Sequence, residues 1–236
     1  MTMRGYLFDA PFRRTDHYLQ LTVPSFEYPR SDLPEHLQFV GTLPPASSGD
    51  YVEPEWWPEL SAGRPVVVVT QGTVANTDLH DLVIPTVRAL ADLDVLVVAA
   101  TVREDGPDLV RRALTEVPDN VRLTSFVPFD RLLPHADALV TNGGYGGVQT
   151  ALYHGVPLVV AGASEDKPEV AARVEWSGTG VNLRTGVPEV TELRTAVQTV
   201  LHDPGYRPQA GIMAKEIRQY NPFEAIAEIV EVSARR

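Results

Sequence analysis

Residues 137–149 read Asp-Ala-Leu-Val-Thr-Asn-Gly-Gly-Tyr-Gly-Gly-Val-Gln. A short apolar run, Ala138 to Val140, is followed by four glycines within positions 143–147 and then by a helix-compatible segment, residues 148–154. A strand, a glycine turn and a helix in this order present unpaired backbone N–H groups to an anion. Glycine suits such a turn because it reaches positive φ without strain and lets a ligand approach the main chain. The stretch therefore predicts either a tight turn of an α/β fold or an anion-binding site.

The sequence around this stretch alternates between apolar runs and helical patterns. Residues 65–70 form a continuous β-branched run, which is typical of a strand buried on both faces. Further strands are expected at residues 94–99, 121–126, 138–140, 157–161 and 180–183, and helices near residues 79–90, 106–114, 168–176, 193–200 and 208–218 and from Asn221 onward. Strands that alternate with helices at this spacing indicate βαβ units. We therefore predict an α/β fold with a doubly wound, parallel, Rossmann-like sheet.

Four loops of this predicted sheet follow its strands, and they are residues 71–77, 126–129, 142–147 and 162–168. Asn76 or Thr77 in the first of them is expected to cap the next helix. Ligands of such sheets bind outside the carboxyl ends of the strands, where these loops converge. Their convergence favours a ligand site over a simple turn at the glycines.

Residues 1–62 differ in composition from the rest of the chain. A strand is expected within residues 15–23 and an extended piece at residues 37–40, but prolines recur between positions 24 and 58. Proline at this density disfavours helix and removes ladder donors. We expect a mostly extended linker without a core of its own, which Trp56 and Trp57 fix to a domain surface. Residues 1–62 are thus predicted to end an upstream domain, and residues 63–236 to form the main domain.

Composition narrows the classes of function. The chain has 236 residues, 44% hydrophobic and 22% charged, with no cysteine and a net charge of −11. The absence of cysteine excludes disulfides and thiolate chemistry. An acidic chain without a basic cluster is a poor candidate for nucleic-acid binding. The apolar runs are too short to span a membrane, and the first residues do not resemble a signal peptide, so we expect a cytoplasmic protein.

The glycine stretch differs from two common phosphate-binding motifs. The dinucleotide fingerprint requires G-x-G-x-x-G after the first strand and an acidic residue about twenty positions later. Glu165 and Asp166 lie at that distance, but the glycines here read G-G-x-G-G and follow the fourth predicted strand. A Walker P-loop is excluded because no Gly-Lys-Ser/Thr follows. No metal-ligand spacing, carboxylate pair or serine–histidine–aspartate order stands out either.

A third pattern consists of several short motifs and covers more of the chain than either phosphate-binding motif. Asn142-Gly-Gly-Tyr-Gly-Gly147, Gly155-Val-Pro157 and Asp166-Lys-Pro168 are joined by Gln71-Gly-Thr73 and Phe126-Val-Pro128. Together these motifs resemble the C-terminal, donor-binding half of the two-domain GT-B glycosyltransferases, in particular the macrolide and natural-product enzymes that use UDP- or dTDP-sugars. The resemblance runs from about residue 65 to the C-terminus. It implies that residues 1–62 end an acceptor domain and form the interdomain linker, and that residues 63–236 bind the nucleotide sugar.

The resemblance also implies roles for single residues. Phe126 would stack on the pyrimidine and the Val127 backbone would meet the base edge. Backbone N–H groups of the glycine stretch would hold the diphosphate, with the first loop approaching from the other side. Asp166 and Lys167 would bind the sugar hydroxyls. The implied donor site comprises Gly72, Thr73, Phe126, Val127, Asn142, Gly143, Gly144, Gly146, Gly147, Val148, Asp166 and Lys167.

Three positions depart from the family pattern. Asn142 stands where the family has a phosphate-binding histidine, so that only amide donation is expected there. Phe129 replaces a glutamine. Thr150 replaces the glutamate that hydrogen-bonds the ribose hydroxyls in many members. Loss of that carboxylate weakens the case for a ribonucleotide and makes a deoxythymidine diphosphate sugar a donor to test. If UDP binds as tightly as dTDP, that argument fails.

Simpler interpretations exist for each residue. Phe126 could belong to the core, Thr73 could cap its loop, and Asp166 could be the N-cap of the helix that starts near Pro168. All six histidines are expected to be structural: His17, His36, His80, His135, His154 and His202.

The resemblance implies inverting sugar transfer to a hydroxyl of a small-molecule acceptor, without a cofactor or metal. Because the acceptor and the catalytic base belong to the other half of such enzymes, this chain is expected to bind donor without turnover. Its exposed cleft face would also allow it to self-associate. The alternatives are a non-catalytic nucleotide-sugar-binding module and a fragment of a sugar-nucleotide 2-epimerase.

Overall fold

A computed structural model describes residues 15–46, 49–73 and 76–235. The start of the predicted N-terminal segment, before residue 15, and residues 74–75 of the first predicted loop lie outside this range. In the described part, all six strands of the main sheet run parallel in the order β5-β4-β3-β6-β7-β8. They are β3 (Val66–Thr70), β4 (Leu96–Ala100), β5 (Val121–Thr124), β6 (Ala138–Thr141), β7 (Leu158–Val160) and β8 (Gly180–Asn182). The predicted α/β fold with a doubly wound parallel sheet is confirmed.

The strand order places the first strand of the sheet, β3, beside the fourth, β6, and Val67 of β3 pairs with both Val97 and Ala138. From β3 the chain proceeds outward to β4 and β5, and then returns across the sheet to β6. This is the order 3-2-1-4-5-6 of a Rossmann fold, in which the crevice between the two halves lies where the order reverses.

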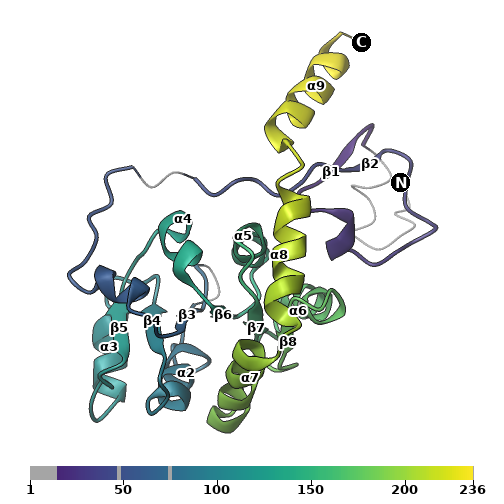
Figure 1. Cartoon of the computed structure of the whole chain (residues 1–236). Coiled ribbons are helices and arrows are strands. Elements are labelled where there is room, and N and C mark those ends of the chain that lie inside the picture. Colours follow the sequence, from purple (N-terminus) through teal and green to yellow (C-terminus); the bar gives the residue numbers. More distant parts are fainter. Residues whose placement is uncertain (1–14, 47–48, 74–75, 236) are drawn as a thin grey trace.

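Helices cover both faces of the sheet (Figure 1). They are α2 (Val83–Leu90), α3 (Gly106–Ala113), α4 (Phe129–Leu132), α5 (Tyr145–Tyr153), α6 (Lys167–Trp176), α7 (Val190–His202), α8 (Tyr206–Ile217) and α9 (Pro222–Ala234), with the 3₁₀ turns η1 (Pro24–Phe26), η2 (Trp57–Ser61) and η3 (Leu133–His135). Alternate valines of β3 enter two separate cores because side chains alternate along a strand. Val66 and Val68 pack with α5, α6 and α8, whereas Val67 and Val69 pack with α2, α3 and α7. Burial on both faces explains the continuous apolar run.

Two predicted helix starts are wrong. Helix α5 begins at Tyr145 and not at residue 148, so that two of the glycines lie in its first turn. Helix α2 begins at Val83, and its N-terminus is capped neither by Asn76 nor by Thr77. The Gln71 side-chain oxygen accepts from the N–H groups of Leu82 and Val83, each at 3.2 Å, and this long-range contact supplies the cap.

The N-terminal segment, residues 15–62, is mostly extended, as predicted, and packs on the main domain. Its strands β1 (Tyr18–Gln20) and β2 (Leu37–Phe39) form a small parallel pair. Val23, Phe26 and Leu60 are buried in the core that contains α5, α6 and α8. Trp56 and Trp57 pack against the same core. The segment therefore shares the core of the main domain, and the predicted anchoring role of the two tryptophans is confirmed.

The C-terminal helix α9 projects from the rest of the molecule (Figure 1). The side chain of Asn221 caps it by accepting from the N–H of Glu224 at 3.4 Å, as expected from the Asn-Pro start. Pro222 is its one buried residue. In the part of the chain that the structure describes, no helix combines the length and apolarity that crossing a bilayer requires.

Candidate functional site

A central cavity of about 520 Å³ opens at the carboxyl ends of the strands, where β3 and β6 lie side by side. This volume is in the range of small-molecule sites, and the place is the switch point of the sheet. Nearly all of the predicted donor-site residues line it, from Gly72 and Thr73 to Asp166 and Lys167. Gly143 and Val148 do not.

Gly143 lies in the turn that precedes α5. Its φ is +84°, and a Cβ built on it would lie 2.7 Å from Cγ1 of Val160. Both the backbone conformation and the close approach therefore require glycine. Its N–H donates to the Thr141 hydroxyl at 3.3 Å. Gly143 thus positions the loop and does not line the cavity.

The anion-binding site at the start of α5 differs by one residue from the prediction. The N–H of Val148 donates to the carbonyl of Gly144 at 3.1 Å, and the Val148 side chain is fully buried. The prediction that Val148 offers its N–H to a ligand is therefore wrong, because the helix has already begun. The N–H groups of Tyr145, Gly146 and Gly147 lie in the first turn, where no intrahelical acceptor exists. The sequence pattern does not single out Tyr145, because the glycines around it are typical of a loop.

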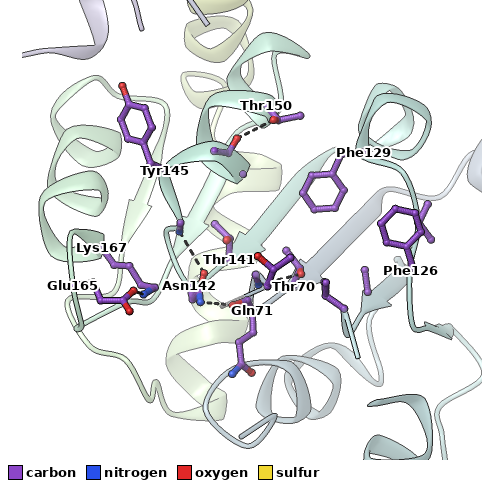
Figure 2. Close-up of a pocket in the computed structure, with 18 of the residues that line it drawn as sticks. Thr70, Gln71, Phe126, Phe129, Thr141, Asn142, Tyr145, Thr150, Glu165 and Lys167 are labelled. Atoms are coloured by element: carbon purple, nitrogen blue, oxygen red, sulfur yellow. Dashed lines mark hydrogen bonds and ion pairs between the residues drawn. The ribbon is translucent and has the colours of Figure 1, made fainter. Parts of the chain in front are cut away.

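Asn142 joins the two loops on either side of the switch point. Its side-chain amide donates to the carbonyl of Gln71, and its side-chain oxygen accepts from the N–H of Gly144 at 3.4 Å. Gln71 in turn donates to the carbonyl of Asp78 at 2.7 Å and caps α2 as described above. One donor of Asn142 is thereby used within the protein. Figure 2 shows the contact between Asn142 and Gln71.

An aromatic ring stands at one end of the cavity. Phe126 follows β5 and is 61% exposed, so the interpretation of Phe126 as a core residue is wrong. The adjacent Val127 is 3% exposed and turns its side chain into the core. Phe129 packs partly against that core and also lines the cavity. Thr150 lines the same region, with its hydroxyl donating to the carbonyl of Gly146 at 2.8 Å.

Charged side chains gather at the opposite end, in the loop after β7 and at the start of α6 (Figure 2). The Lys167 ammonium pairs with the Glu165 carboxylate and donates to the Ser164 hydroxyl at 3.3 Å. The Lys167 side chain is only 5% exposed, against 57% for Glu165. Asp166 is the N-cap residue of α6, but its side chain makes no capping hydrogen bond, so the interpretation of its carboxylate as a simple cap is wrong. Glu165 lines the cavity and was not in the predicted donor site.

The N-terminal segment holds the cavity side of α5. Tyr145 accepts from the side-chain amide of Gln20 at 3.1 Å and donates to the carbonyl of Leu21 at 3.4 Å. Burial raises the pKa of the Tyr145 phenol, which keeps it neutral. One turn later, Gln149 accepts from the hydroxyls of Thr22 at 3.1 Å and Thr42 at 2.7 Å. These contacts join positions more than a hundred residues apart, which local sequence patterns do not reveal.

The lining of the cavity limits its chemistry. Of the residues that the structure describes, Lys167 is the only cation in the lining, and no histidine lies there. No group of three or more potential metal-ligating side chains occurs among these residues. The cavity thus offers helix amides, aromatic rings, two carboxylates and one ammonium.

Comparison with known proteins places this architecture in a family. Residues 85–232 match the family described as Erythromycin biosynthesis protein CIII-like, C-terminal domain. The chain is 51% identical over 230 residues to 4'-demethylrebeccamycin synthase of Lentzea aerocolonigenes, with 98% of this chain and 52% of the relative covered. It is 42% identical over 233 residues to UDP-glycosyltransferase 2 of Phaeomoniella chlamydospora, with 98% and 51% covered.

Solved structures agree with the sequence relatives. The glycosyltransferase VinC, determined in complex with dTDP, superposes with a TM-score of 0.73 at 28% identity, over 93% of this chain and 53% of VinC. The chain spans about half the length of the relatives it matches. From this sheet order, this cavity and these matches, we conclude that the chain belongs to the Erythromycin biosynthesis protein CIII-like C-terminal domain family of glycosyltransferases.

Proposed function

We propose that the central cavity binds a nucleoside diphosphate sugar and that this chain is the donor-binding part of a glycosyltransferase. One observation carries the proposal: an exposed aromatic ring, a helix N-terminus and a charged loop line one cavity in that order. A base stacked on Phe126 extends its diphosphate toward the amides of Tyr145, Gly146 and Gly147. The sugar then lies beside the loop that contains Asp166 and Lys167.

The same geometry suggests how the chain assists transfer. An acceptor hydroxyl oxygen attacks the anomeric carbon from the face opposite the diphosphate, its proton passes to a base, and the bond from carbon to phosphate oxygen breaks with inversion. Negative charge develops on the leaving diphosphate, which the helix N-terminus of α5 stabilises. We propose that this requires no metal or cofactor, and that the base and the small-molecule acceptor site belong to another part of the enzyme. The chain by itself then binds donor without turnover.

The ribose end of the cavity suggests which nucleotide is preferred. Thr150 lies near Phe129 and Phe126, and its hydroxyl donates to the helix carbonyl of Gly146. It provides no carboxylate to accept from two ribose hydroxyls. We therefore propose that dTDP binds more tightly than UDP. The dTDP complex of VinC supports a thymidine nucleotide, whereas the name of UDP-glycosyltransferase 2 supports uridine.

Phe126 provides the test of the donor site. We expect Phe126→Ala to weaken dTDP and UDP binding by roughly tenfold or more, because stacking of a base on an aromatic ring contributes about 1–3 kcal/mol. The free energy of unfolding should change by less than about 0.5 kcal/mol, since the ring is exposed. Isothermal titration calorimetry and urea denaturation measure the two effects.

Phe223→Ala is the matched control, because Phe223 is also 61% exposed but lies on α9, outside the cavity lining. It should leave nucleotide affinity unchanged. Equal affinities of the two variants would contradict the proposed stacking, and glycosylation of a small hydroxylic acceptor by the purified chain would contradict the lack of turnover.

A further inference from the structure

We propose that the charged end of the cavity selects donors with a neutral or cationic sugar and rejects donors whose sugar carries a carboxylate, such as hexuronic acids. This inference rests on the proposed donor site and specifies its substrate class. It follows from the three consecutive charged residues Glu165, Asp166 and Lys167, all of which line the cavity.

The positive charge of the Lys167 ammonium is already paired with a carboxylate within the protein. It is buried, pairs with the Glu165 carboxylate and donates to the Ser164 hydroxyl. A sugar carboxylate could pair with Lys167 only by displacing Glu165. Since burial of a charge is unfavourable unless it is paired, the existing pair is retained unless a better partner replaces it.

Asp166 adds a second carboxylate at the same place. Among the described residues it has no ion-pair partner, and its side chain does not cap α6. Two carboxylates and one ammonium leave one net negative charge at this end of the cavity. Like charges at close range oppose binding, whereas carboxylate acceptors suit the hydroxyl or ammonium donors of neutral and amino sugars.

The backbone of Glu165 supports a functional role for its side chain. Its φ is +58°, in the left-handed region that favours glycine. A glutamate there is strained, and strained residues cluster at functional sites. The conformation brings the Glu165 carboxylate over the cavity, onto the ammonium of the residue two positions later.

Calorimetry with the full 236-residue chain tests the inference with four probes: UDP, dTDP, UDP-glucose and UDP-glucuronate. We expect UDP-glucose to bind about tenfold more tightly than UDP-glucuronate or better, a ratio that shrinks as salt is added. Glu165→Gln frees the Lys167 ammonium for the sugar carboxylate, so this ratio should fall by about tenfold or reverse.

Glu169→Gln removes the same charge four residues later, in the first turn of α6. Its carboxylate is 75% exposed, pairs with Arg173 and lies outside the cavity lining, so the ratio should stay at the wild-type value. Asp166→Asn should lower the ratio in the same direction as Glu165→Gln and serves if that variant fails to fold.

The outcomes separate the two proposals. Wild-type affinities for UDP-glucose and UDP-glucuronate within twofold of each other, with UDP bound, would overturn the inference and leave the donor site standing. A tighter complex with UDP-glucuronate would do the same. Failure of UDP and of dTDP to bind at all would overturn both.

Discussion

Asn142 illustrates how one side chain in the lining of a cavity can also fix the loops that form it. The family pattern has a histidine at this position, which suggested a direct contact with phosphate. In the structure its amide holds the loop after β3 against the loop after β6 through the carbonyl of Gln71. The residue is 8% exposed, so water has little access to the partners that it hydrogen-bonds. The geometry of both loops therefore depends on this residue.

Substitution of Asn142 should affect stability and binding separately. Asn142→Ala leaves the Gln71 carbonyl without its partner, and we expect a loss of about 1–3 kcal/mol in the free energy of unfolding. Asn142→Asp loses the same donor and adds a negative charge beside the helix N-terminus that would hold the diphosphate. UDP affinity, measured by calorimetry, should therefore fall further with Asp than with Ala. Equal UDP affinities of the Asp and Ala variants would show that a charge at position 142 does not affect binding of the diphosphate.

At the scale of the element, helix α5 and the turn before it contain glycines with two different functions. Gly143 has a positive φ and a neighbour in the way of any Cβ. Gly146 and Gly147 have helical backbone, and a Cβ on either would meet nothing within 4 Å. The first glycine is required by the fold. The other two leave space in the cavity for a ligand.

This difference predicts effects of opposite sign. Gly143→Ala should lower the free energy of unfolding by roughly 2 kcal/mol or more, from backbone strain and from the clash with Val160. Gly147→Ala should raise it by about 0.5–1 kcal/mol, because alanine is the better helix former. Its methyl group would enter the space proposed for the diphosphate, so UDP binding should weaken. Urea denaturation and calorimetry give both quantities, and an unchanged UDP affinity in Gly147→Ala would place the diphosphate elsewhere.

The elements of this fold differed in how well the sequence predicted them. Val66 to Val69 were correctly predicted as a buried strand, because an uninterrupted β-branched run has few other solutions. The predicted start of α5 is too late because local propensity disfavours glycine in helices, whereas Gly146 and Gly147 lie in the first turn of this helix. Two other features depend on three-dimensional contacts and backbone conformation. They are the cap that Gln71 provides for α2 and the ion pair between Glu165 and Lys167. Such features have no periodic signal in the sequence.

At the scale of the whole molecule, the N-terminal segment is bound to the main domain by apolar and charged contacts. Phe26 is fully buried in the core beside α5, α6 and α8. Two ion pairs add to this, Glu27 with Arg173 at 2.7 Å and Glu59 with Arg122 at 2.6 Å. Because these contacts are distributed along the segment, we expect it to fold and unfold together with the sheet.

Phe26 tests this expectation. Phe26→Ala should lower the free energy of unfolding by about 3–5 kcal/mol, the usual range for truncating a buried phenylalanine. Fluorescence reports on Trp56 and Trp57 in the segment and on Trp176 in α6, while circular dichroism reports on the helices. The two denaturation curves should coincide in the wild type and in the variant. A fluorescence transition that precedes the loss of helix would show that the segment detaches first, and Phe223→Ala serves as the exposed control.

Helix α9 contributes little to that cooperative unit, since Pro222 is its one buried residue. A 13-residue helix with so few tertiary contacts is marginal in water. Its backbone amides can therefore exchange their hydrogens with solvent through local opening, while β3 and β6 exchange only when the whole domain unfolds. Two populations of amides follow, and a protease should cut within residues 222–234 long before the sheet becomes accessible.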